Sequence, residues 1–98
     1  VHGFSAIWEV WSAYLGADGY LAASGLRGYA VGDGQVPGVM DTGTMAAPLA
    51  RTKTIAQNAA VLGEYIRNVQ QATGAEQVDV LAHSMGGMIT RYYLDRLM

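Results

Sequence analysis

Apolar and polar positions alternate along the chain in a way that predicts a series of helices and strands. The clearest helix is predicted over residues 52–73, with Thr52 or Thr54 as the cap at its start and Gly74 closing its end. Its apolar positions recur at steps of three and four residues and form one stripe, made of Ile55, Ala59, Leu62, Ile66 and Val69. We therefore expect this helix to cover one face of a sheet.

Two further stretches have helical spacing. The pattern over residues 7–24 is interrupted by Gly16 and Gly19, so it predicts a helix, a break and a second short helix that stops at Gly25. The pattern over residues 88–98 predicts a largely buried helix that follows two consecutive glycines.

Short apolar runs lie between these helical stretches. Residues 26–31 and 78–82 are short and contain β-branched or aromatic residues, and both are predicted to be strands. Residues 1–4 resemble the end of a further strand. Because strands and helices alternate, the expected fold class is α/β, with a parallel sheet flanked by helices.

The irregular stretch over residues 32–48 is too long for a simple connection, and we expect it to line or cover a substrate cleft. It is not a phosphate loop, because the last glycine of that pattern is missing and no helix follows. Within it, Asp41 and Thr42 precede a glycine, as in an aspartic protease. Those enzymes need two facing copies and mostly β structure, so these two residues are instead predicted to stabilise a turn.

Composition narrows the classes of protein to which the chain can belong. With 98 residues and 51% hydrophobic content, it is expected to form part of one globular domain. Its formal net charge of −2 and the lack of a basic run argue against nucleic acid as a partner. The chain has no cysteine, which excludes disulfides, thiolate zinc sites and a cysteine nucleophile. No metal or organic cofactor is expected.

The chemistry is expected where the strand over residues 78–82 meets the following helix. In the sequence Ala82-His83-Ser84-Met85-Gly86, the residues two before and two after the serine are both small. Such a turn holds its serine in a strained conformation and exposes the hydroxyl, and larger residues at the second neighbours would clash. The Met85 N–H at the helix start would then face a developing oxyanion. The alternative is that Ser84 only caps the helix.

The segment His2-Gly3-Phe4 is the second candidate part of this site. Gly3 lets the backbone approach a ligand closely, so the Phe4 N–H is a candidate second oxyanion donor. The alternative is an ordinary glycine turn. His2 is expected to brace this loop by hydrogen bonding, and we do not assign it as the catalytic base.

These motifs together resemble the α/β-hydrolase fold, and within it the bacterial triacylglycerol lipases and carboxylesterases. The resemblance rests on residues 1–4, 25–31, 77–88 and 91–94. It implies Ser84 as the nucleophile, the Phe4 and Met85 backbone N–H groups as the oxyanion hole, and His2, Gly3, Ala82, His83 and Gly86 as supporting residues. His83 is expected to pack near the site, with its side chain directed away from the hydroxyl.

In that family an Asp or Glu and then a His follow the serine. Only fourteen residues follow Ser84 here, and none is a histidine. Asp95 lies within the helix after the turn, so it is not assigned as the acid. We therefore expect residues 1–98 to be the amino-terminal, incomplete part of a single α/β-hydrolase domain, truncated after this helix, and to be inactive alone.

The expected function of the full-length protein is hydrolysis of lipid or other carboxylic esters through an acyl-enzyme. The protein is also expected to contact a lipid interface and to be secreted. Two alternatives stay open: a non-catalytic, truncated hydrolase-like binding module, and an acyltransferase using the same turn. Chain-length preference, a lid and the oligomeric state are not addressed by the sequence.

Overall fold

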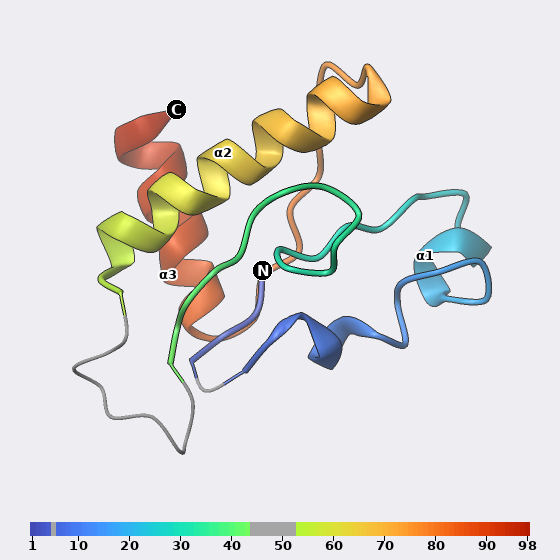
Figure 1. Ribbon diagram of the computed structural model, residues 1–98, viewed down its shortest axis with the longest axis horizontal. Coiled ribbons are helices and arrows are strands. Elements are labelled where there is room, and N and C mark those ends of the chain that lie inside the picture. The colour runs from blue at the N-terminus through green and yellow to red at the C-terminus, as the bar shows by residue number, and fades with distance from the viewer. Residues whose placement is uncertain (5, 44–52) are drawn as a thin grey trace.

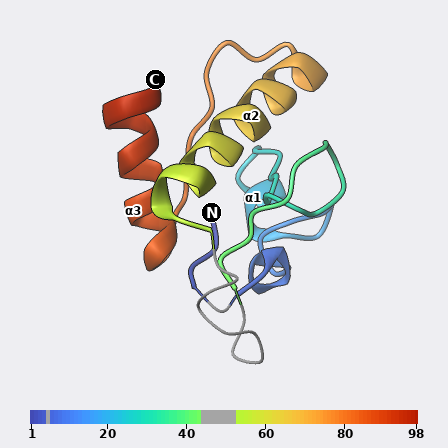
Figure 2. The same ribbon diagram turned by 60° about the vertical axis from the view of Figure 1, so that its left-hand side comes forward.

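The computed structural model describes residues 1–4, 6–43 and 53–98. Two helices dominate it, α2 (Ile55–Thr73) and α3 (Met85–Tyr92), and α3 continues into the π-helical turn η3 (Tyr93–Leu97). Figures 1 and 2 show α3 on one side and the single-turn helix α1 (Tyr20–Ala23) on the other, with the N-terminus between them. Residues 44–48 of the predicted irregular stretch, and the candidate cap Thr52, lie outside the described residues.

Local signals set both ends of α2. The Thr54 hydroxyl accepts a hydrogen bond from the Gln57 N–H at 3.1 Å, and the Gln57 side chain accepts one from the Thr54 N–H at 2.9 Å. This reciprocal capping box satisfies two N–H groups that the first turn of a helix leaves without partners. Gly74 ends the helix with φ 75°, a conformation that glycine adopts without a side-chain clash. The cap at Thr54 and the stop at Gly74 are confirmed.

The apolar core forms where α2 meets α3 and the segment over residues 31–40. Ala59, Leu62, Ile66 and Val69 of the predicted stripe are buried, whereas Ile55 at the helix start is only partly buried. From α3, Ile89 is completely buried against them. The remaining buried members of the core are Val31, Val36, Met40 and Tyr65.

Tyr65 also connects α2 to the turn after residues 26–30. Its hydroxyl lies 3.0 Å from the Ala30 carbonyl oxygen and 3.1 Å from Oδ1 of Asp33. Burial would raise the pKa of Asp33, but hydrogen bonds from the backbone of Ala30 and Gln35 and from neighbouring side chains outweigh it, and the pKa is lowered. The Tyr65 hydroxyl therefore binds this turn to the middle of α2.

The helical prediction over residues 7–24 is confirmed only in outline. The described residues form a 3₁₀ turn, η1 (Trp8–Trp11), and the single-turn helix α1 (Tyr20–Ala23), which ends before Gly25 at φ 77°. The helix predicted over residues 88–98 begins three residues earlier, at Met85, directly after Ser84.

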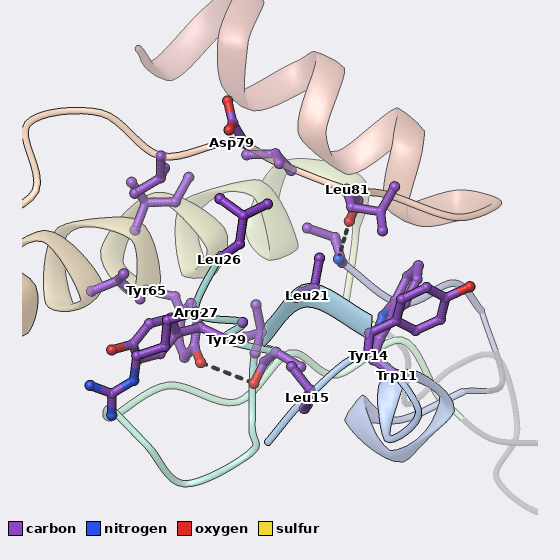
Figure 3. Close-up of a pocket in the computed structure, with 18 of the residues that line it drawn as sticks. Trp11, Tyr14, Leu15, Leu21, Leu26, Arg27, Tyr29, Tyr65, Asp79 and Leu81 are labelled. Atoms are coloured by element: carbon purple, nitrogen blue, oxygen red, sulfur yellow. Dashed lines mark hydrogen bonds between the residues drawn. The ribbon is translucent and has the colours of Figure 1, made fainter. Parts of the chain in front are cut away.

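The predicted parallel sheet requires correction, because no strand forms among residues 1–4, 6–43 and 53–98. The two segments predicted as strands, residues 26–31 and 78–82, both line one cavity of about 630 Å³, the second through residues 78–81. Figure 3 shows Leu26 and Leu81 on its wall. A strand requires backbone hydrogen bonds to a neighbouring strand about 4.8 Å away, and residues 26–31 and 78–82 form no such bonds with each other.

One strand-like pairing is nevertheless present at the edge of this cavity. The Val1 amino group donates to the Leu81 carbonyl at 2.6 Å, and the His83 N–H donates to the Val1 carbonyl at 3.1 Å. These two bonds flank Ala82 in the way that a parallel ladder does. They bring the N-terminal segment alongside the turn that carries Ser84.

Candidate active site

Ser84 has the backbone conformation φ 56°, ψ −127°, and it is the one non-glycine residue with positive φ among those the structure describes. For a residue with a side chain this region costs about 1–3 kcal/mol, and such strain occurs mainly at functional sites. Ser84 is exposed and stands at the N-cap position of α3, yet its side chain makes no capping hydrogen bond. A role only as a helix cap therefore does not account for this residue.

Backbone hydrogen bonds hold the turn on which Ser84 lies. The Gly86 N–H donates to the His83 carbonyl at 3.0 Å, and the Gly87 N–H donates to the Ser84 carbonyl at 2.9 Å. Met85 is the first residue of α3, so no carbonyl within the helix can accept its N–H. That N–H and the positive end of the helix dipole lie next to the serine.

Gly86 is the point where α3 touches the N-terminal segment. A Cβ added there would overlap the Val1 carbonyl oxygen and lie 2.7 Å from the His2 carbonyl oxygen. The spacing of the turn predicts a small residue here to avoid a clash with Ser84. The structure adds a second reason, a close contact with the backbone of residues 1–2, which are distant in sequence.

Gly3 lies directly against Ser84. A Cβ added to Gly3 would be 2.9 Å from Ser84 Cβ, 3.3 Å from Ser84 Oγ and 3.1 Å from the His83 carbonyl oxygen. The peptide between Gly3 and Phe4 therefore runs beside the serine hydroxyl, and only glycine fits there. The Phe4 side chain is 39% exposed.

His2 lies beneath this loop and is only 2% exposed. Its Nδ1 is 3.1 Å from the Gly3 carbonyl oxygen and 3.4 Å from Oγ1 of Thr42. Burial lowers the pKa of His2, and the hydrogen bond to Gly3 opposes this only in part. The ring is thus neutral at pH 7, and its contacts are with the loop.

We predict that acid destabilises the protein through His2. Because its folded-state pKa lies below the unfolded value of 6.5, the unfolded chain binds the proton first as the pH falls. The part of the free energy of unfolding that depends on His2 should be constant above about pH 7 and fall below pH 6.5, by at most about 1.4 kcal/mol per pH unit. Urea unfolding between pH 5 and 8 measures this.

His2→Asn is the control for that measurement, because its amide keeps a donor near Nδ1 but does not titrate. The slope below pH 6.5 should be smaller in this variant by the contribution of His2, whereas the Val1 amino group, whose pKa burial lowers to about 6, contributes equally to both proteins. The Asp33 carboxyl does not interfere, because its lowered pKa places its titration below its usual 3.8. A slope of unchanged size in His2→Asn would assign the acid sensitivity to another group.

The other predicted supporting residues surround the turn. Ala82 and Met85 are partly buried, and Ala82 is flanked by the two hydrogen bonds to Val1. His83 is exposed rather than packed, which corrects the expectation made for it.

Thr42 is predicted from the sequence only to stabilise a turn, but its hydroxyl donates to the Gly3 carbonyl at 2.9 Å. Nothing in the local sequence pattern indicates this contact.

The cavity of Figure 3 does not have the serine among its lining residues. Its wall ends at Val1 and Leu81 and includes neither Ser84 nor Gly3. The described residues contain no group of three or more His, Cys, Asp or Glu side chains able to hold a metal ion. No helix within the described ranges is long and apolar enough to cross a membrane.

A family model described as alpha/beta hydrolase fold matches residues 1–97. The match extends from the N-terminal loop through the Ser84 turn to the end of η3. No solved structure matches the chain.

Proposed function

The chain belongs to the alpha/beta hydrolase fold family, which indicates a hydrolase-type function, and we propose that it supplies the nucleophile and oxyanion hole of a serine hydrolase acting on carboxylic esters. The observation that carries this proposal is the conformation of Ser84. A strained, exposed serine at a helix start is the arrangement that a nucleophilic hydroxyl requires.

In the proposed reaction, Ser84 Oγ bonds to the ester carbonyl carbon while a base accepts the hydroxyl proton. The carbonyl oxygen becomes an oxyanion and lies between the N–H groups of Met85 and Phe4. When this intermediate collapses, the bond between the carbonyl carbon and the alcohol oxygen breaks. The alcohol takes the proton from the base and leaves, and the acyl group stays on Ser84 as an acyl-enzyme. Water then attacks the acyl carbon and releases the acid, which restores Ser84.

Two donors are proposed because charge that develops on the oxygen is stabilised by N–H groups already in place. Loss of one such donor typically lowers kcat by about 10²–10³-fold. The contact of Gly3 with Ser84 supports Phe4 as a donor, and the start of α3 at Met85 supports the other. Lipid esters are the substrates we propose, as in the lipases that the sequence resembles, and secretion is proposed on the same ground.

The general base is proposed to come from outside residues 1–98. The chain contains two histidines. The His2 imidazole is engaged with Gly3 and Thr42, and neither imidazole hydrogen-bonds to Ser84. The acid that orients the base is proposed to lie outside this sequence as well, since Asp95 is placed within η3.

We predict that residues 1–98 alone hydrolyse p-nitrophenyl butyrate at less than about 10⁻³ of the rate of the natural gene product that contains them, because the base is missing. A fluorophosphonate should modify Ser84 in that gene product, as detected by peptide mass spectrometry. The intact mass of the gene product shows how much further chain it contains.

Two results would contradict this assignment. Modification of another residue, with Ser84 unlabelled in an active protein, would remove Ser84 as the nucleophile. Comparable Ser84-dependent turnover by residues 1–98 would place the base within this sequence. Adding a primary alcohol separates ester hydrolysis, in which the acid dominates, from acyl transfer, in which a new ester accumulates.

A further inference from the structure

The carbonyl of Gly3 is anchored by side chains that are distant in sequence. The Thr42 hydroxyl donates to it at 2.9 Å across 39 residues, and His2 Nδ1 lies 3.1 Å from the same oxygen. Thr42 is 1% exposed, and both Gly3 and His2 are buried with it. A carbonyl oxygen has two lone pairs, so these two donors satisfy it fully.

Building on the ester-hydrolase function proposed above, we infer that Thr42 is a positioning residue that sets the direction of the Phe4 N–H in the oxyanion hole. The carbonyl of Gly3 and the N–H of Phe4 belong to one peptide unit. That unit is planar and trans, so its C=O and N–H point in opposite directions. Fixing the carbonyl therefore fixes the N–H.

This peptide needs an external anchor because glycine does not resist rotation. A residue with a side chain would limit φ and ψ at position 3, but Gly3 must lack one to lie against Ser84. Rotating the peptide would leave its buried carbonyl without partners and turn the N–H away from the oxyanion. The Thr42 hydroxyl opposes that rotation.

Thr42 is itself held in place on both sides. Met40, two residues earlier, is 4% exposed and packs in the apolar core against α2. On the other side, the Gly43 N–H donates to Oδ1 of Asp41 at 3.1 Å, which closes a turn around Thr42. The loop over residues 40–43 is therefore anchored in the core at Met40, and it holds the Thr42 hydroxyl in place against the Gly3–Phe4 peptide beside Ser84.

The test compares Thr42→Val with Thr42→Ser in the natural gene product. Valine keeps the shape of threonine and removes the hydroxyl, whereas serine keeps the hydroxyl and removes a methyl group. We expect Thr42→Val to lower kcat for p-nitrophenyl butyrate by about 10- to 100-fold with KM changed less than about twofold. Thr42→Ser should retain kcat within about threefold of the natural protein.

An alkyl boronic acid gives a second readout, because it forms a tetrahedral adduct with the serine and occupies the oxyanion hole. Its inhibition constant should rise in Thr42→Val in proportion to the loss in kcat and stay near the natural value in Thr42→Ser. Titration with a fluorophosphonate counts the active sites in each preparation, so kcat is expressed per active site. A partly unfolded variant therefore does not give a falsely low kcat.

The outcomes separate the role of Thr42 from the function of the site. If Thr42→Val keeps kcat, or if Thr42→Ser loses as much as Thr42→Val, the hydroxyl does not position the loop and the inference is overturned. Ser84→Ala is the companion control. If it remains active, the proposed function fails; if it is inactive while Thr42→Val is unaffected, only the role of Thr42 is removed.

Discussion

Replacing Ser84 with alanine in the natural gene product is expected to lower kcat for ester hydrolysis by a factor on the order of 10⁶, because no other group would form the acyl-enzyme. The free energy of unfolding should change by less than about 0.5 kcal/mol. The Ser84 side chain is exposed and caps no helix, so its hydroxyl contributes little to the fold.

A second substitution at the same position tests the strain. Ser84→Gly should be equally inactive but more stable than Ser84→Ala by about 1 kcal/mol, because φ 56° with ψ −127° is a conformation that favours glycine. Initial rates and urea unfolding of the three proteins measure both effects. If the two variants were equally stable, Ser84 would not be strained, and if either kept substantial activity, the nucleophile would be elsewhere.

Replacing Gly86 with alanine is expected to destabilise the protein by about 3 kcal/mol, at the upper end of the usual cost of overpacking. The added Cβ would overlap the Val1 carbonyl oxygen and approach the His2 carbonyl oxygen to 2.7 Å. Both neighbours are backbone atoms, so relief requires the N-terminal segment to move away from α3. Because that segment also carries Gly3, kcat should fall as well.

Gly87 is the matched control, since it is the next residue on α3 and a Cβ there would meet nothing within 4 Å. Gly87→Ala should stabilise the protein by about 0.5–1 kcal/mol, the usual gain from replacing an unconstrained helical glycine. Urea unfolding of the two variants gives the comparison. Equal effects of the two substitutions would show that the N-terminal segment does not pack against Gly86.

Elements with local sequence signals can be located from the sequence alone. The capping box at Thr54, the glycine at position 74 and the periodic apolar stripe between them act within a few residues, so α2 could be located from the pattern alone. The turn at Ser84 was also predicted from five consecutive residues, because its geometry depends on small neighbours and on the helix that follows.

Contacts between distant segments depend on the packing of the whole chain. Residues 26–31 and 78–82 have strand-like composition, but a strand requires a paired neighbour, and these two segments do not pair with each other. Thr42 carries no local signal for its contact with Gly3, because a threonine in a turn can donate to any carbonyl that the fold places beside it. Hydrogen bonds between residues 39 positions apart depend on how the whole chain packs, and a local pattern does not contain that information.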